Sequence, residues 1–368
     1  MKATLILENW ESFEWISFWY EANITGEIVF NTGMVWYSET LTDPSYKEQI
    51  LTFTFPLIWN YGIPDFNLVD FFWLKKYFES DNIHLNAIIV SEYSETFNHQ
   101  EAKKSLWEFL KENKKIWITW IDTRKLTKII RKEGTMVGKI IIWEENIGNE
   151  NFHSLQEIEE KQKYIEKTNF SKKVSFKEII KYWKWKKKIC LVDMWVKNNI
   201  IRNLLEFDTE IIRVPYNYPF MDWSIEFDGI FISNWPWNPE NCTETINELK
   251  KAIKSDKNIF WICLWNQLIA LASWAKTYKL KYWHRWQNQP CRDLKTKKCI
   301  ITSQNHSYAI DNESLWEEIE TWFENINDKT NEWIKFKNKN ISSVQFHPES
   351  CPWPSDSKYL FKDFVESL

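Results

Sequence analysis

The chain has 368 residues, which is enough for two domains with separate cores. Its formal net charge is −4, so charge gives no reason to expect nucleic acid or an anionic membrane surface as a main partner. It contains no run of about 18 apolar residues and no signal-peptide pattern, so we expect neither a membrane span nor secretion. Six scattered cysteines without a C-x-x-C pair predict reduced thiols in a cytoplasmic protein, with no disulfide framework and no metal site.

Two residue types have abnormal frequencies, because the chain holds 25 tryptophans and only 7 glycines. Average usage predicts about 26 glycines in this length. Many tryptophans stand where turns normally need glycine, as in Asn234-Trp-Pro-Trp-Asn238 and Ser273-Trp-Ala275. We hypothesise that most are glycine in the living protein, through a reassigned codon, such as a stop codon, that was translated as tryptophan. The alternative is a protein that is truly rich in tryptophan.

Residues 1–145 predict a smaller, strand-rich α+β domain. Apolar β-type runs bounded by turn residues occur at 3–7, 26–30, 50–55 and 86–90. Apolar residues recur at helical spacing in two further segments, which predicts helices over 101–113 and 123–132. Asp122 or Thr123 would cap the second helix.

Residues 146–187 are rich in glutamate, lysine and asparagine, and we interpret them as a charged linker. The stretch ends in the basic run from Lys181 to Lys188, which contains three aromatic residues. We interpret this run as a solvated approach to the next domain. Binding of single-stranded nucleic acid through the interleaved aromatic residues is the alternative.

Residues 188–368 alternate between strand-like and helix-like segments, which predicts an α/β domain with a doubly wound, largely parallel sheet. Ligand sites in such sheets lie at the carboxyl ends of the strands. Ser233, Asn234, Cys263 and His347 each follow an apolar strand-like run. We therefore expect them at one edge of the sheet.

The segment from Asn258 to Ala272 passes from an apolar strand pattern through Cys263 into a helix pattern. A nucleophile on such a strand-to-helix turn is exposed at the end of the sheet, and the helix N-terminus favours a thiolate. The turn normally needs glycine two residues before and two residues after the nucleophile. Trp261 and Trp265 occupy these places, so the sterics contradict the chemistry.

His347 and Glu349 supply the other two groups that a cysteine nucleophile needs. Residues i and i+2 of an extended segment point the same way, so Glu349 can orient His347. A lone buried cysteine or a His-Pro-Glu turn would each have a purely structural explanation. Their expected position at one edge of the sheet predicts a Cys263–His347–Glu349 catalytic triad.

These motifs resemble those of the class I glutamine amidotransferases. The segment from Trp261 to Gln267 resembles the motif G-I-C-L-G-[HN]-Q, with both glycines written as tryptophan. The segment from Gln345 to Glu349 matches a second motif, and Ser233-Asn-Trp-Pro-Trp237 resembles S-N-G-P-G. The N-terminal segments 30–37, 41–46 and 121–127 are similar to the small subunit of carbamoyl-phosphate synthase. The resemblance covers essentially the whole chain.

The resemblance implies a glutaminase in which Cys263 attacks glutamine, His347 moves the proton and Glu349 orients His347. It implies that the backbone N–H groups of Leu264 and Trp235 hold the oxyanion. The implied glutamine pocket contains Ser45, Trp235, Trp237, Leu264, Gln267, Asn305, Ser307 and Tyr308. Lys197, His284, Arg285 and Asn288 also resemble family positions, and we interpret them as scaffold.

The resemblance further implies a large-subunit partner in a heterodimer or a higher assembly. That partner would use the ammonia with bicarbonate and ATP to make carbamoyl phosphate for arginine and pyrimidine biosynthesis. This chain has no nucleotide-binding signature, so we expect no cofactor on it, and ATP and a divalent metal on the partner. Two alternatives are an amidotransferase subunit of another synthase, and an inactive homologue if the motif tryptophans are real.

Overall fold

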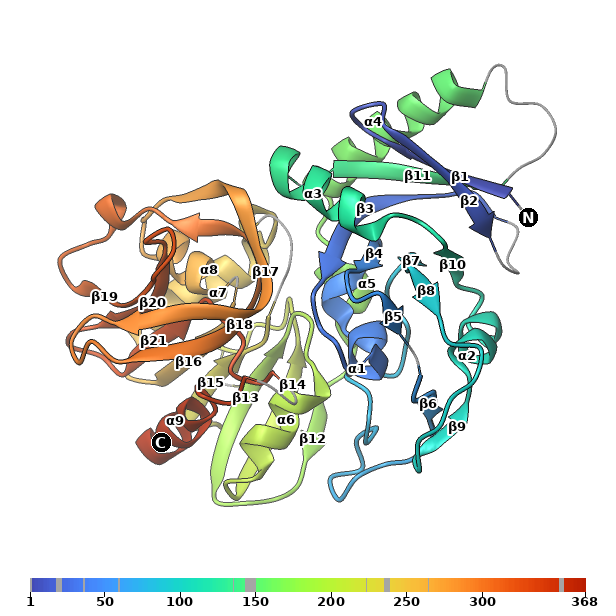
Figure 1. Ribbon diagram of the computed structural model, residues 1–368. Coiled ribbons are helices and arrows are strands. Elements are labelled where there is room, and N and C mark those ends of the chain that lie inside the picture. Colours follow the sequence, from blue (N-terminus) through green and yellow to red (C-terminus); the bar gives the residue numbers. More distant parts are fainter. Residues whose placement is uncertain are drawn as a thin grey trace. The chain divides into compact units, whose positions relative to one another are not determined.

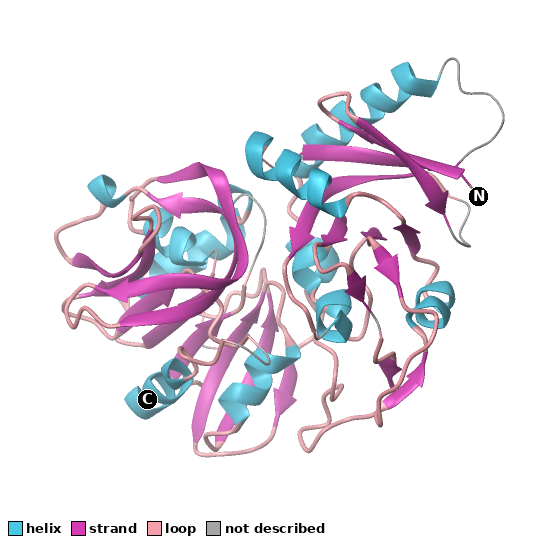
Figure 2. Ribbon diagram, in the orientation of Figure 1, coloured by secondary structure: helices cyan, strands magenta, loops and turns pink. Residues whose placement is uncertain are grey.

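The computed structural model describes residues 2–17, 22–35, 37–58, 60–134, 136–142, 150–222, 224–234, 239–263, 265–350 and 354–368. The chain divides into two compact units, Met1–Thr168 and Asn169–Leu368, and each has its own sheet (Figures 1 and 2). Within the described ranges, no helix is both long enough and apolar enough to cross a membrane.

The N-terminal unit is built on a sheet that closes on itself in the order β1-β11-β3-β4-β7-β10-β2. These strands are β1 (Lys2–Leu7), β2 (Ser12–Ser17), β3 (Ile24–Asn31), β4 (Gln49–Phe53), β7 (Ala87–Ile89), β10 (Ile116–Thr119) and β11 (Met136–Ile142). Two short pairs lie outside it: β5 (Leu57–Ile58) with β8 (Glu92–Tyr93), and β6 (Ile63–Pro64) with β9 (Ala102–Lys104). The helices are α1 (Tyr37–Thr42), η1 (Pro44–Tyr46), α2 (Leu106–Glu112), α3 (Thr123–Glu133) and α4 (Glu150–Lys167).

The two helices predicted in this unit are present, but one begins later than predicted. Helix α3 begins at Thr123, and the side chain of Asp122 caps it by accepting a hydrogen bond from Lys125 N at 2.7 Å. Helix α2 begins only at Leu106, because residues 102–104 pair with β6 as strand β9. A capping box between Ser105 and Glu108 fixes this start.

The charged region predicted as a linker contains ordered elements of both units. Helix α4 packs on β11 and β3 of the closed sheet. Its charges make ion pairs there, from Glu157 to Lys139 at 3.0 Å and from Lys161 to Glu48 at 2.6 Å. The boundary between the units falls at residues 168 and 169, so α4 belongs to the first unit. The amino-acid composition indicated a linker because it does not show that these charged side chains pair with other residues of the N-terminal unit.

The C-terminal unit holds a ten-stranded sheet in the order β12-β14-β13-β15-β16-β21-β20-β19-β17-β18. Its parallel part comprises β14 (Thr209–Pro215), β13 (Lys187–Asp193), β15 (Gly229–Ile232), β16 (Asn258–Ile262) and β21 (Ile341–Val344). Antiparallel strands flank it, namely β12 (Ile180–Tyr182) on one side and β20 (Asn331–Phe336), β19 (Ile319–Asn325), β17 (Thr277–Asp293) and β18 (Cys299–Ile310) on the other. The α/β class with a preceding strand-rich domain is thus confirmed.

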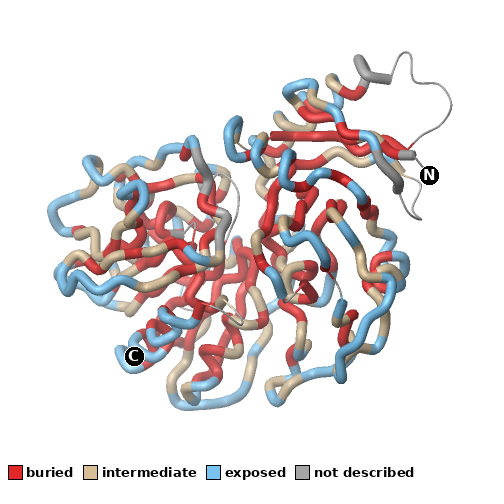
Figure 3. Tube along the Cα trace, in the orientation of Figure 1, coloured by how far each residue is buried: buried red, intermediate tan, exposed pale blue. Residues whose placement is uncertain are grey.

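Helices cover both faces of this sheet. They are α5 (Ser171–Val174), α6 (Asn198–Leu205), η2 (Pro239–Asn241), α7 (Thr243–Lys254), α8 (Trp265–Ala272), η3 (Asn312–Ser314) and α9 (Tyr359–Ser367). Helix α6 contacts α9, and α7 contacts α8, and the two pairs lie on opposite faces of the sheet (Figure 1). Strands β15 and β16 lie between them and are buried almost throughout (Figure 3), which explains their continuous apolar sequences.

Among the residues that the structure describes, five tryptophans adopt a backbone conformation that suits glycine. Residues 10, 73, 120, 183 and 274 have φ between 56° and 69°, and all five are tryptophan. Their side chains are exposed, so no burial offsets the strain. For a bulky residue this region of φ is a genuine outlier, whereas glycine enters it without steric cost. The fold therefore supports the hypothesis that glycine belongs at these positions.

Candidate active site

Cys263 lies directly after β16, between the carboxyl ends of β15 and β21. Its φ is 64°, and its backbone N–H donates to Val344 O at 2.7 Å. The chain then turns at once into α8, where Asn266 N donates to Cys263 O at 3.0 Å. A non-glycine residue held at positive φ on a strand-to-helix turn is the geometry of a nucleophile elbow. The turn predicted around Cys263 is therefore present.

Trp261 occupies the place two residues before the nucleophile. Its side chain is fully buried, and its indole Nε1 has no hydrogen-bond partner within the described part of the chain. An unpaired buried N–H costs about 1–3 kcal/mol. This defect is what glycine at position 261 would remove. The side chain of Trp265, on the other side of the nucleophile, lies outside the described residues.

His347 and Glu349 follow β21, the strand next to β16. Nδ1 of His347 lies 2.7 Å from Oε1 of Glu349, so the N–H donates to the carboxylate. This hydrogen bond fixes the tautomer and leaves Nε2 as the nitrogen for proton exchange. Nε2 has no hydrogen-bond partner among the described groups, and both side chains are buried.

The electrostatics of the pair favour a charged histidine. Burial lowers the pKa of His347, but the charges of Cys263 and then Glu349 outweigh it and raise the pKa to about 10. Burial raises the pKa of Glu349, yet His347 and Lys197 hold it at about 2. The site can therefore keep an imidazolium and a carboxylate in contact within a buried environment.

Lys197 contacts Glu349 of the candidate site, whereas the sequence analysis interpreted it as scaffold. Its Nζ lies 3.3 Å from Oε1 of Glu349, and its side chain is 11% exposed. Lys197 precedes α6, just after the carboxyl end of β13 in the same sheet. Its position just after a predicted strand, at the same edge of the sheet as Cys263, is the sequence feature that could have placed Lys197 in the site.

Strand β18 brings part of the predicted glutamine pocket to the nucleophile. Sγ of Cys263 lies 3.8 Å from Asn305 O. Nε2 of Gln267, on α8, donates to Tyr308 O and also to Gln345 Oε1, the latter at 2.9 Å. Ser307 is buried on the same strand. Of the predicted pocket residues, these four lie on the two elements that flank Cys263.

For the other predicted pocket residues, the structure gives no position relative to Cys263. Trp235, Trp237 and Leu264 lie outside the described residues, so the proposed oxyanion donors stay predictions. Ser45 is buried in η1 of the N-terminal unit, where its N–H donates to Asp43 Oδ1 at 2.8 Å. Its role in binding glutamine also stays a prediction.

Cysteine elbows that face a histidine–glutamate pair across adjacent parallel strands define the class I glutamine amidotransferases. The family model for this class matches residues 190–367, and the model for the carbamoyl-phosphate synthase small chain matches residues 5–140. The chain belongs to the carbamoyl-phosphate synthase small chain family. The N-terminal match disfavours an amidotransferase subunit of another synthase.

Named relatives match this chain in sequence over essentially its full length. The arginine-specific small chain of carbamoyl phosphate synthase from Saccharomyces cerevisiae is 40% identical, over 100% of this chain and 89% of its own. The multifunctional protein CAD of Squalus acanthias is 43% identical, over 99% of this chain and 16% of its own. A solved structure from Thermoplasma acidophilum, described as a candidate GMP synthase component, covers 50% of this chain and 94% of its own. That structure has a TM-score of 0.44 and 21% identity.

Proposed function

We propose that this glutaminase subunit hydrolyses L-glutamine through Cys263, His347 and Glu349. The observation that carries the proposal is the strained Cys263 elbow, at φ 64°, beside a histidine whose Nδ1 lies 2.7 Å from a carboxylate. The Cys263 thiolate attacks the side-chain amide carbon, and the carbonyl oxygen becomes an oxyanion. His347 then gives its proton to the departing nitrogen, which leaves as ammonia.

The resulting thioester is hydrolysed by the reverse use of the same histidine. His347, now neutral, takes a proton from water, and the hydroxide displaces Cys263 to release glutamate. Glu349 holds the imidazole in place through both steps. Backbone N–H groups of Leu264 and Trp235 would hold the oxyanion, and losing one such donor costs about a hundred- to a thousandfold in rate.

The glutamine pocket is proposed on the same basis. Gln267, Asn305, Ser307 and Tyr308 would line the side next to Cys263, since they lie on α8 and β18. Ser45 and Trp237 complete the proposed pocket. Glycine at positions 235 and 237 would give the backbone the close approach to substrate that an indole prevents.

The ammonia would pass to a large subunit, which uses it with bicarbonate and ATP to form carbamoyl phosphate. ATP and a divalent metal would bind on that partner, and we propose a cytoplasmic assembly. In the catalytically inactive alternative, the motif tryptophans are real and fill the glutamine pocket. This alternative depends on the residue type at four positions, which can be tested directly.

The test is glutaminase activity of two recombinant forms, each with the large chain supplied. One form keeps the written sequence, and the other carries glycine at positions 235, 237, 261 and 265. We expect glutamate release from the glycine form alone. Activity in the written form would refute the glycine hypothesis, and inactivity in both forms would refute the catalytic assignment.

A further inference from the structure

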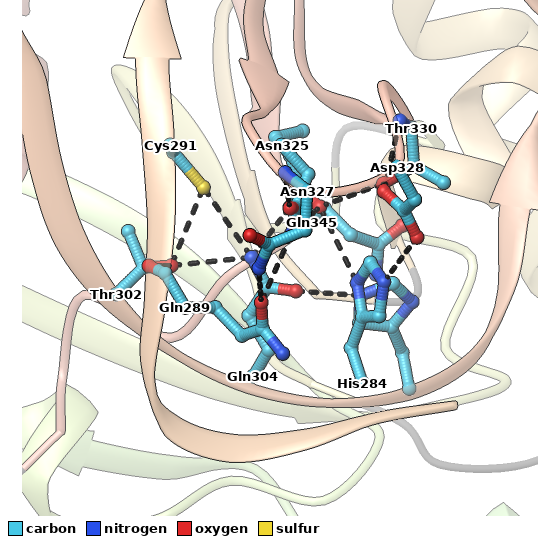
Figure 4. Close-up of polar contacts among 12 residues, drawn as sticks. His284, Gln289, Cys291, Thr302, Gln304, Asn325, Asn327, Asp328, Thr330 and Gln345 are labelled. Atoms are coloured by element: carbon cyan, nitrogen blue, oxygen red, sulfur yellow. Dashed lines mark hydrogen bonds and ion pairs between the residues drawn. The ribbon is translucent and has the colours of Figure 1, made fainter. Parts of the chain in front are cut away.

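A second cluster of buried polar groups draws its members from the hairpin of β17 and β18 and from strand β20 of the same sheet (Figure 4). It contains His284, His306 and Glu332, whose ligating atoms all lie within 4.8 Å of one another. These residues are at most 5% exposed. None of the three has a part in the proposed hydrolysis.

The outward-facing nitrogens of both histidines meet acceptors. Nε2 of His284 lies 2.7 Å from Asp328 Oδ2, and Nδ1 of His306 lies 2.8 Å from Tyr308 O. Because a carboxylate and a carbonyl can only accept, each of these nitrogens carries the hydrogen. The inner nitrogens, Nδ1 of His284 and Nε2 of His306, then present lone pairs to each other at 3.1 Å.

Two further acceptor oxygens complete the inner set. Oε1 of Glu332 lies 3.5 Å from Nδ1 of His284, and Oε1 of Gln304 lies 3.1 Å from Nε2 of His306. The amide of Gln304 is held in this orientation, because its Nε2 donates to Glu332 Oε2 at 2.8 Å. Four acceptor atoms therefore converge, and neutral histidines in these tautomers place no hydrogen among them. Oε1 of Glu332 also accepts from Thr330 Oγ1 at 3.1 Å, so the two histidine nitrogens and Gln304 Oε1 are the acceptors that a bound cation would satisfy.

Three of the separations suit a tetrahedral metal ion. Zinc bonds to nitrogen and oxygen of about 2.0–2.1 Å place neighbouring ligand atoms roughly 3.3 Å apart. The three consecutive separations here are 3.5, 3.1 and 3.1 Å, and the ligating atoms of His284, His306 and Glu332 all lie within 4.8 Å of one another. Metal-bound histidines usually donate their other N–H to a carboxylate or a backbone carbonyl, as Asp328 and Tyr308 provide. We propose that His284, His306, Glu332 and Gln304 form a structural site for a divalent transition metal such as Zn²⁺.

The site would support the strand that carries the glutamine pocket. Gln304 and His306 flank Asn305 on β18, and His306 donates to the same Tyr308 carbonyl that accepts from Gln267. Four protein ligands leave no open position, which is typical of structural rather than catalytic zinc. No sequence pattern indicated this site, because the ligands come from three separated segments without cysteine.

The competing occupant is a single proton on His284. Burial lowers the pKa of His284, but hydrogen bonds to Asp328 and Glu332 outweigh it and raise the pKa to about 10. A proton would satisfy Nδ1 of His284 but would leave Gln304 Oε1 facing Nε2 of His306. Metal analysis distinguishes the two occupants.

The experiment uses the full chain in a Cys263→Ala background, which prevents zinc from binding the catalytic thiolate. After growth with zinc and removal of loose metal, we expect one equivalent of Zn²⁺ per chain by elemental analysis. Glu332→Gln and His284→Asn should lose it, and Asp328→Asn should weaken binding about ten- to a hundredfold. The matched control is His84→Asn, which removes a histidine of the other unit and should retain the metal.

Cobalt gives a readout that misfolding cannot imitate. Co²⁺ added to the metal-free chain should produce the intense visible bands of tetrahedral coordination, and these should be absent in Glu332→Gln. Zn²⁺ should also raise the melting temperature of the parent but not of Glu332→Gln. No bound zinc, no cobalt bands and an unchanged melting temperature in the parent would overturn the proposal. Because the background is already without its nucleophile, the result is independent of the proposed hydrolysis.

Discussion

Nζ of Lys197 lies 3.3 Å from Oε1 of Glu349, so a buried cation faces the carboxylate that orients His347. Its charge lowers the pKa of Glu349 and also that of His347. Lys197 therefore affects the balance of charge within the His347–Glu349 pair, although we do not expect it to touch glutamine.

Lys197→Met should raise the pKa of both His347 and Glu349. One pKa unit corresponds to about 1.4 kcal/mol, so we expect roughly a tenfold loss in kcat. The limb of the pH–kcat profile that belongs to His347 should move to higher pH, because the imidazolium releases its proton less readily. Lys358→Met is the matched control, since it removes a surface ion pair with Glu206. An unchanged profile in Lys197→Met would contradict this role.

Trp73→Gly should stabilise the N-terminal unit. Trp73 has φ 63° and is 82% exposed, so it strains the backbone without burying its ring. The left-handed conformation costs an L-residue about 1–2 kcal/mol, and we expect a gain of about 1 kcal/mol in the free energy of unfolding. Urea denaturation measures it. Trp185→Gly, at an exposed tryptophan without positive φ, should give no gain. Equal effects of the two substitutions would argue against glycine at position 73.

Asp193→Asn should strongly destabilise the C-terminal unit. Oδ2 of Asp193 lies 2.8 Å from Nη2 and 3.1 Å from Nε of Arg213, and both side chains are almost fully buried. Removing one partner of a buried ion pair leaves the other charge unpaired, which costs about 3–5 kcal/mol. Replacing both, as in Asp193→Leu with Arg213→Met, should cost less than the single change. Thermal denaturation compares them, and a milder single variant would contradict the account.

His84 should make the N-terminal unit less stable in acid. Burial, and then the charge of Lys47, lower its pKa from the ordinary 6.5 to about 4. Between these values the unfolded chain binds more protons than the folded one, so stability falls as the pH drops from about 6.5 to about 4. The full loss would be about 3 kcal/mol.

His84→Gln should remove most of this pH dependence. Urea denaturation of both forms at several pH values would show a shallower slope for the variant between pH 4 and 6.5. The charged groups that face His84 are Lys47, Lys115 and Asp43, and they remain in the variant. Parallel pH profiles for the two forms would assign the acid sensitivity to other groups.

The parallel strands and the positions of Cys263, His347 and Glu349 in the sheet could be predicted because their signals are local. Strands β13 and β16 are buried on both faces and therefore read as continuous apolar runs. Cys263, His347 and Glu349 each follow such a run, which placed them at one edge of the sheet.

The hairpin of β17 and β18 was missed for a physical reason. Buried polar residues such as His284, Gln304 and His306 interrupt its apolar alternation, and they come together only through contacts that no short window of sequence shows. The closed N-terminal sheet depends in the same way on long-range pairing, as between Leu5 and Ile140.

The most direct test of the central claim is Cys263→Ser in the complex with the large chain. A hydroxyl in place of the thiolate should reduce carbamoyl phosphate synthesis from glutamine by about a thousandfold or more. Synthesis from added ammonia should stay near the parent rate, because that step would not need this chain's nucleophile. Undiminished synthesis from glutamine in Cys263→Ser would contradict the account.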